Sequence, residues 1–402
     1  MPVGSATGYI AVSIMTGFLF GVFLQKGRFC FVSGIRDFVA FKDTRVLKGV
    51  LVGLGILLIF WSTAAAAGYF RGWWIPPWGL TSLIGGLIFG FGMTIAGGCA
   101  TGVLYRCGQG YMQFWLTLVF MGIGYIAIAL AFPTLQGTFF EPLRFGEGTS
   151  LYLTAPWSPA VTGVTVAFAI LILYSILIGR KSLPEKPGQG IQDSDVAQLN
   201  IATLRRPIDA VVIGLQQIVS GTQAYFKGFI DGDRSIKKQL QDPWDARTAG
   251  AGLALTAVVW FVVFDAFTVT GSEVRWTGWV LQQAGVDAEG IEYFGAVMFA
   301  GEGITITVDM LMILFLIVGS FTAAFLSGDF RIRWPKLNRI HNPIIGGLLM
   351  GVGARLAPGC NMANLFSGLA LLSAHSIIAG TGMVIGTYVM TRWMYRDVGC
   401  AY

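Results

Sequence analysis

Long apolar stretches, separated by short polar or glycine-rich segments, run along nearly the whole chain. Several of them reach the roughly 20 residues that a helix needs to cross a hydrocarbon core of about 30 Å. The pattern therefore predicts an all-α, polytopic membrane protein with about nine transmembrane helices. We place these spans at residues 8–25, 46–68, 81–97, 112–132, 158–179, 249–268, 308–327, 342–357 and 375–395.

Charge refines this picture without changing it. Only 12% of the residues are charged, about half the share of a soluble protein. The net charge of +6 does not indicate a nucleic-acid partner, because the basic residues cluster in short loops between apolar stretches. Under the positive-inside rule, segments 26–45 and 328–341 and the C-terminal tail face the cytoplasm. The acidic segments 133–157 and 269–307, the second carrying Glu273, are then outer loops, with the N-terminus outside and the C-terminus inside the inner membrane.

A glycine-rich pattern occurs twice, displaced by 261 residues. The matching positions are Ile84, Gly85, Gly86, Leu87, Gly90, Gly92, Ala96, Gly98 and Cys99, and then Ile345, Gly346, Gly347, Leu348, Gly351, Gly353, Ala357, Gly359 and Cys360. Five predicted spans separate the copies, and an odd number reverses their orientation in the bilayer. The sequence therefore predicts an inverted internal repeat.

The repeat divides the chain into two membrane halves and a connection. We expect a first half over 1–135, a connecting span over 136–180, a cytoplasmic linker over 181–247 and a second, inverted half over 248–402. The linker mixes both charge signs and carries a candidate interfacial helix near 208–228. A fainter echo in the first half places Gly17, Gly21 and Cys30 69 residues before Gly86, Gly90 and Cys99.

Both repeated spans are short and end in turns that do not favour continued helix, Gly97-Gly98 and Pro358-Gly359. We expect them to stop within the bilayer, where non-helical backbone must be buried in protein or line a watery cavity. Residues 100–109 and 361–372 are suited to short re-entrant helices whose first amides point toward the preceding cysteine. Helix N-termini attract anions, so the breaks indicate an anion site.

Nearby charges agree with an anionic passenger. Arg28, Arg106 and Arg355 lie within a few residues of a cysteine, whereas the carboxylate at comparable distance, Asp37, has Arg36 beside it. Asp265 is the one acid predicted well inside a span, and a helix-capping role accounts for it better than ion coupling. This shortage of intramembrane acids favours uncoupled movement.

Five cysteines at uneven spacing, with His341 and His375 as the imidazoles, match neither a disulfide framework nor a zinc site, and we expect no metal or cofactor. A membrane cysteine is ordinarily a small buried hydrophobe. Cys99 and Cys360 instead occupy equivalent positions at two breaks, and Cys30 follows a third. Cys107 aligns with Gly368 in the repeat, and Cys400 is near the chain end, so neither is assigned a role. Neutral thiols at a constriction would offer weak donors to a sulfur anion without holding it tightly.

Three segments together resemble the YeeE/YedE family of sulfur-transport membrane proteins. They are Gly27-Arg28-Phe29-Cys30, Gly97-Gly98-Cys99-Ala100-Thr101-Gly102, and Gly353-Ala354-Arg355-Leu356-Ala357-Pro358-Gly359-Cys360-Asn361. The resemblance implies an hourglass-like importer of thiosulfate in which Cys30, Cys99 and Cys360 pass the ion on, with Gly98, Thr101, Gly359 and Asn361 beside them. It also implies a TusA-like cytoplasmic sulfur carrier as partner, which we do not expect to be fused to this chain. The long linker and segment 269–307 are closer to the YedE branch, which is linked to selenium, so a selenium compound is an alternative substrate.

Two other classes of function remain open at this point. A membrane enzyme that exchanges sulfane sulfur or electrons would need a cysteine paired in C-x-x-C or activated by a base, and the sequence offers neither. A purely structural scaffold would leave the paired breaks unexplained. We therefore predict a transporter and not an enzyme.

Overall fold

The computed structural model describes residues 7–69, 73–154, 156–179, 241–264 and 267–396. Almost all of its regular structure is helical, and the only strands in these residues, β1 (Trp78–Gly79) and β2 (Arg144–Gly146), pair as a short antiparallel hairpin. The first half contains α1 (Thr7–Lys26), α2 (Phe31–Phe41), α3 (Arg45–Ala66), α4 (Leu80–Ala96), α5 (Ala100–Gly108) and α6 (Met112–Leu135). The second contains α11 (Ala246–Val263), α12 (Val269–Gln283), α13 (Val308–Leu326), α14 (His341–Leu356), η5 (Met362–Gly368) and α15 (Ala374–Met394). Between them lie η2 (Gln136–Phe140), α7 (Leu151–Thr154) and α8 (Pro159–Gly179), and the second half also holds η3 (Tyr293–Met298) and η4 (Leu337–Arg339).

Every predicted span corresponds to one of these helices. The ends agree within a few residues, the largest difference being α11, which ends at Val263 instead of near residue 268. Six helical segments of the described chain are long and apolar enough to cross a membrane. The prediction of an all-α polytopic membrane protein is confirmed, and the count of nine spans stays a prediction.

The segment 269–307, predicted as an outer loop, is not a loop throughout. Its first part is the helix α12, which packs against α6 and α13, and Glu273 on this helix is buried, with 3% of its surface exposed. Counting Glu273 among the loop charges was therefore wrong. A carboxylate of this kind was missed because charge alone cannot distinguish a loop residue from a polar residue on the inner face of a helix.

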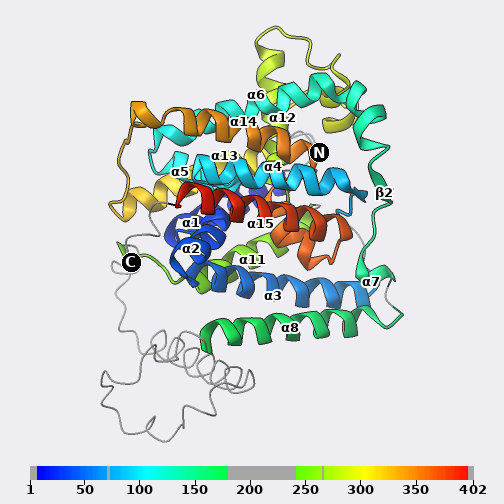
Figure 1. The fold of residues 1–402 in the computed structure, drawn as a ribbon. Helices are drawn as coiled ribbons and strands as arrows, with labels where there is room; N and C mark the ends of the chain where they lie inside the picture. The colour runs from blue at the N-terminus through cyan, green and yellow to red at the C-terminus, as the bar shows by residue number, and fades with distance from the viewer. Residues whose placement is uncertain (1–6, 70–72, 155, 180–240, 265–266, 397–402) are drawn as a thin grey trace, which may run out of the picture. The chain divides into compact units, whose positions relative to one another are not determined.

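The two halves repeat one order of elements, in which a long helix and a short helix are followed by two long helices, a second short helix and a final long helix. Their packing is reciprocal: α1 lies on α13 and α11 on α3, while α4 lies on α15 and α14 on α6. Figure 1 shows α4 beside α15 and α3 beside α11. Reciprocal contacts of this kind are what a pseudo-two-fold relation between two halves produces.

Helices α4 and α14 carry the repeated glycines and run antiparallel along each other. Gly85 lies against the backbone nitrogen of Ala357, and Gly346 lies against that of Ala96, the equivalent residue of the other copy. A side chain at either position would meet backbone atoms. The repeat is therefore inverted, and its glycines allow the two helices to approach closely.

Gly85→Ala is expected to lower the stability of the protein, because its methyl group would overlap with the backbone of α14. Overpacking against atoms that cannot move typically costs about 1–3 kcal/mol. The check is the thermal unfolding midpoint of purified protein in detergent. The matched control is Gly55→Ala on α3, where an added Cβ meets nothing within 4 Å. Equal midpoints for the two variants would contradict the close approach.

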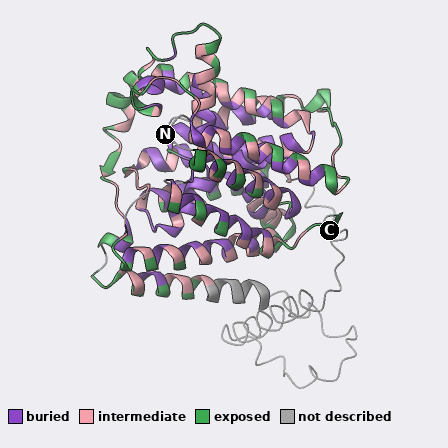
Figure 2. Ribbon diagram, turned by 180° about the vertical axis from the view of Figure 1, so that it is seen from behind, coloured by how far each residue is buried: buried purple, intermediate pink, exposed green. Residues whose placement is uncertain are grey.

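Buried and exposed residues are distributed as a membrane environment requires. Figure 2 shows the buried residues gathered where the helices face one another. The outer faces of the long helices carry large apolar side chains, among them Val119 and Leu130 on α6, Val262 on α11 and Phe325 on α13. Such apolar faces suit contact with lipid.

The chain divides into a compact unit of residues 1–163 and 240–402 and a second unit of 164–239. In the second, the structure describes only residues 164–179, which form most of α8. The candidate interfacial helix near 208–228, Asp265 and Cys400 lie outside the described residues.

Candidate functional site

Three helix breaks, each followed by a short helix, place the three candidate cysteines. Cys99 precedes α5, Cys30 precedes α2, and Cys360 precedes the helical turn that continues into η5. Helix α4 ends because Gly97 adopts the left-handed conformation (φ 76°), which lets the amide of Gly98 bond back to the carbonyl of Met93 at 3.1 Å. After α14 the glycine with positive φ is Gly359, at 105°, which is the repeat counterpart of Gly98 and makes the equivalent bond, from its amide to the carbonyl of Ala354 at 3.1 Å. The predicted short helices after Cys99 and Cys360 are confirmed.

Cys30 and Cys99 meet although 69 residues separate them. Their sulfur atoms are 3.6 Å apart and both side chains are fully buried. Thr101 brings its hydroxyl oxygen to 3.3 Å from the sulfur of Cys99. Gly102 faces both thiols, since a Cβ at this position would lie 2.7 Å from the sulfur of Cys30 and 3.3 Å from that of Cys99. The first part of the site is therefore a buried pair of thiols, next to which Gly102 of α5 has no side chain.

Arg106 binds the turn at Gly97 and Gly98, which precedes Cys99 of the thiol pair. Its guanidinium donates to the carbonyl of Gly97 and to the hydroxyl of Tyr105 at 3.1 Å, and it lies over the ring of Phe114 at 5.0 Å. The same ring and guanidinium cover Gly98, where a Cβ would come within 3.0 Å of the ring. Arg106 thus fixes the break in α4 and adds a positive charge near the buried sulfurs.

Cys360 forms the second part of the site and is 1% exposed. Its sulfur interacts with the backbone amides of Met362 and Ala363 in its own turn and with that of Thr270 at the start of α12. The neighbouring Asn361 donates from its amide nitrogen to the sulfur of Met93 at 3.1 Å. Because Met93 lies six residues before Cys99 on α4, the Cys360 turn folds back toward the helix that leads to the thiol pair.

Arg355 supplies the charge next to Cys360. Its side chain is 8% exposed, donates to the hydroxyl of Tyr293 at 3.3 Å and lies over the ring of Tyr125 at 5.4 Å. Among the described residues it forms no ion pair with a carboxylate, and its Nε atom has no hydrogen-bond partner. A buried guanidinium without a paired carboxylate is suited to an anion.

A cavity of about 710 Å³ reaches the Cys360 turn and is lined by Arg355, Pro358, Gly359, Thr268 and Thr270, with Trp74 and Trp78 among its other walls. Two further arginines of the cavity are already paired: Arg144 with Glu147, and Arg275 with Asp309 at 2.8 Å. Arg355 is therefore the arginine of this cavity that forms no ion pair with a carboxylate among the described residues.

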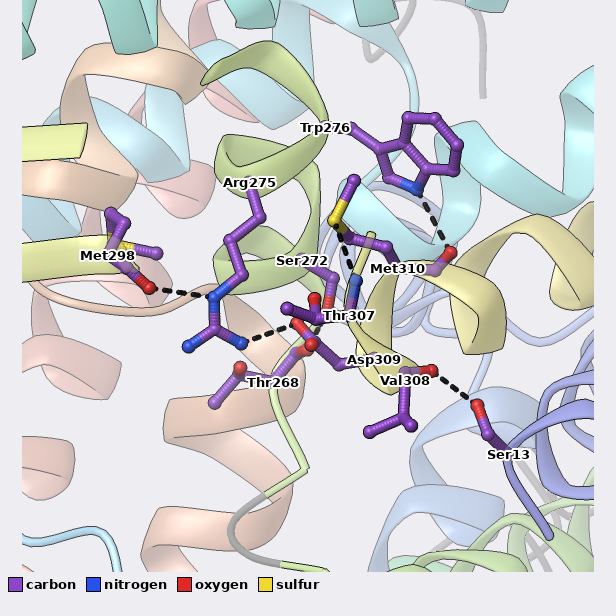
Figure 3. Close-up of polar contacts among 10 residues, drawn as sticks. All are labelled: Ser13, Thr268, Ser272, Arg275, Trp276, Met298, Thr307, Val308, Asp309 and Met310. Carbon is purple, nitrogen blue, oxygen red and sulfur yellow. Dashed lines mark hydrogen bonds and ion pairs between the residues drawn. The ribbon is translucent and has the colours of Figure 1, made fainter. Parts of the chain in front are cut away.

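A network of hydrogen bonds fixes α12, which carries Thr270 and Glu273, against the start of α13. As Figure 3 shows, Arg275 bridges the carbonyl of Met298 and the carboxylate of Asp309, and the Trp276 indole donates to the carbonyl of Met310 at 2.9 Å. Ser13 of α1 donates to the carbonyl of Val308. The contacts of Arg275 and Trp276 hold the middle of α12 against η3 and α13, and the Ser13 bond joins α1 to the start of α13.

Not every residue predicted from the sequence joins the site. The side chain of Arg28 is 63% exposed and lies 3.7 Å from Asp329, away from the buried thiols. Cys107 is buried on α5, beyond the thiol pair. No group of three or more His, Cys, Asp or Glu in the described chain is arranged to hold a metal ion.

The structure adds residues that sequence reasoning missed, namely Gly102, Thr270, Tyr125 and Glu273. The internal repeat carried a signal for two of them, Thr270 and Glu273. If the span at 249–268 is the counterpart of the span at 8–25, a short helix should follow it as α2 follows Cys30, and α12 is that helix.

Comparison with known proteins connects this geometry to a family. The family described as sulphur transport matches residues 26–389. The chain belongs to the sulphur-transport family. The confirmed resemblance places this protein among transporters and not among enzymes, as the sequence predicted.

Two curated relatives are similar to nearly the whole chain. The thiosulfate transporter TsuA of Spirochaeta thermophila is 29% identical over 408 residues, covering 96% of this chain and 99% of its own length. TsuA of Escherichia coli is 26% identical over 96% of this chain and 95% of its own. The probable transporter YedE of E. coli is 35% identical, but over 152 residues, or 37% of this sulphur-transport protein and 38% of YedE.

Proposed function

We propose that this sulphur-transport protein imports thiosulfate, or a closely related sulfur anion, along a path lined by Cys30, Cys99 and Cys360. The observation that carries the proposal is the buried contact between the sulfurs of Cys30 and Cys99, two residues from separate helix breaks. Similarity to two thiosulfate transporters over 96% of the chain supports this substrate.

The chemistry of neutral thiols fits the passage of such an anion. A thiol is a weak hydrogen-bond donor with a polarisable sulfur. It can contact the terminal sulfur of thiosulfate without the strong retention that a lysine or arginine in the same constriction would cause. Gly102 leaves room beside the Cys30–Cys99 pair, and Thr101 adds a hydroxyl group there.

Charge and free polar atoms support binding at the Cys360 end of the path. Arg355 brings an unpaired positive charge, and the buried hydroxyl of Thr270 and carbonyl group of Asn361 have no partner among the described residues. The hydroxyl of Thr270 can donate to a thiosulfate oxygen, whereas the carbonyl oxygen of Asn361 only accepts hydrogen bonds and would not contact the anion. The cavity that reaches Arg355 provides an aqueous approach to Cys360.

The charged loops support a proposal for direction and cellular setting. Under the positive-inside rule, the basic segments 26–45 and 328–341 support a cytoplasmic position for one face, with the N-terminus outside and the C-terminus inside the inner membrane. The Cys360 cavity then faces outward, because it is lined by residues of the acidic segments, including Glu141 of segment 133–157 and Tyr293 of segment 269–307. A TusA-like carrier on the cytoplasmic side would consume the imported sulfur.

The substrate can be tested by growth. A host that cannot assimilate other sulfur sources is expected to grow on thiosulfate, and not on sulfate, when this protein is produced. A gain of selenite toxicity with no growth on thiosulfate would instead favour the selenium compound suggested by the partial similarity to YedE. The uninduced host is the control.

A further inference from the structure

The carboxyl group of Glu273 is buried next to the proposed path. Glu273 on α12 is 3% exposed and accepts a hydrogen bond from the hydroxyl of Tyr125 at 2.6 Å through its Oε2 atom. Its other oxygen, Oε1, is buried and has no hydrogen-bond partner among the described residues. A proton can therefore reside on Oε1 without breaking any contact that the structure records.

Glu273 is linked to Arg355 through one aromatic ring. The guanidinium of Arg355 lies over the ring of Tyr125, whose hydroxyl binds Glu273, and the charges of Glu273 and Arg355 interact. When Glu273 is ionised, its negative charge compensates the guanidinium. When Glu273 is neutral, the positive charge of Arg355 is uncompensated and available to an anion, because the interior screens charges poorly.

The cavity beside Arg355 ends within one helical turn of Glu273, which does not itself line that cavity. Thr270 lines the 710 Å³ cavity, and it lies one helical turn before Glu273, on the same face of α12. The titratable and charged groups around Glu273 come from several elements. They are Tyr125 on α6, Arg355 on α14, Cys107 on α5, Cys360 before η5, Tyr293 on η3, and the paired Arg275 and Asp309 on α12 and α13.

We propose that Glu273 binds a proton in the transport cycle, so that the protein carries protons together with its anion. The inference rests on the proposed function, because it requires Arg355 to bind the transported anion. A proton from water adds to Oε1, Arg355 then binds the anion, and both are released on the other side as the carboxylate re-forms. One proton for each thiosulfate dianion would halve the net charge moved into a negative interior, and so reduce the electrical work opposing import.

The test uses proteoliposomes that contain a pH-sensitive dye, with the membrane potential clamped at zero, to which labelled thiosulfate is added outside. In the wild type, label uptake should be accompanied by acidification of the lumen and should slow as external pH rises, because less Glu273 is protonated. Glu273→Gln should still admit label, but acidification should fall at least about tenfold and the pH dependence should disappear. Glu292→Gln, an exposed glutamate of the same segment, should behave as the wild type.

The two readouts separate the failure of this inference from that of the proposed function. Label uptake by the wild type without acidification, or undiminished acidification by Glu273→Gln, would overturn proton coupling and leave thiosulfate transport standing. Absence of label uptake by the wild type would overturn both. If Glu273→Gln does not insert, Tyr125→Phe keeps the carboxyl group and removes its hydrogen bond. The pH of half-maximal uptake should then shift, and an unchanged value would overturn the inference.

Discussion

Cys360→Ala is expected to slow thiosulfate uptake by about 100-fold, which corresponds to about 3 kcal/mol of activation free energy. Cys360 is buried between two helix starts and next to Arg355, so its loss removes the contact through which the anion would leave the cavity and enter the constriction. Cys99→Ala should have a similar effect at the thiol pair. The measurement is the initial rate of uptake into proteoliposomes at equal amounts of inserted protein.

Cys107→Ala is the matched control, because Cys107 is also a buried cysteine of the same half as Cys99 but makes no thiol contact recorded in the structure. Its uptake rate should remain close to that of the wild type. Equal losses for Cys107→Ala and Cys360→Ala would mean that any buried cysteine matters for folding, and normal uptake by Cys360→Ala would remove Cys360 from the path.

Gly102→Ala is expected to reduce uptake at least about tenfold while the unfolding midpoint changes little. The new methyl group would lie 2.7 Å from the sulfur of Cys30, so the Cys30 side chain must turn away and the thiol pair separates. Stability should change little, because alanine is favoured over glycine inside a helix by about 1 kcal/mol, which offsets the displacement of one small side chain. Uptake and thermal unfolding are measured on the same preparation.

The control for this variant is Gly122→Ala on α6, where the added methyl group meets only the side chain of Thr277 at ordinary contact distance. It should leave uptake and stability near the wild type. Normal transport by Gly102→Ala would show that the arrangement of Cys30 and Cys99 does not limit the rate, which contradicts the proposed relay.

Much of the fold could be predicted because its signals are local or repeated. Apolar stretches located every long helix, and the repeated glycines indicated an inverted pair that the antiparallel contact of α4 with α14 confirms. Even the weak echo of Cys30 and Cys99 was informative, since the two sulfurs touch. Glycine and cysteine patterns succeed here because close helix contact and helix breaks restrict which residues fit.

The environment of charged side chains could not be predicted in the same way. Arg28 is close to Cys30 in sequence, but it points to the surface and meets Asp329, 301 residues away. Glu273 was assigned to a loop, although α12 buries it against Tyr125. Arg28 lies in the turn between α1 and α2, where its direction is set by the turn. The burial of Glu273 depends on which face of α12 turns inward, and the mixed composition of this helix does not predict that face. The expectation of uncoupled transport was based on a shortage of acidic residues within the membrane, and it did not count Glu273 among them.

Transport of intact thiosulfate can be tested with thiosulfate that is labelled differently at its two sulfur atoms. The measurement is uptake of both labels by the purified protein in liposomes, without any soluble partner. We expect both labels to accumulate inside at equal rates as intact thiosulfate, and Cys360→Ala to slow the accumulation of both by about 100-fold. Appearance of only one label inside, or chemical turnover of thiosulfate without accumulation, would show that the cysteines perform sulfur transfer and would contradict transport of the intact anion.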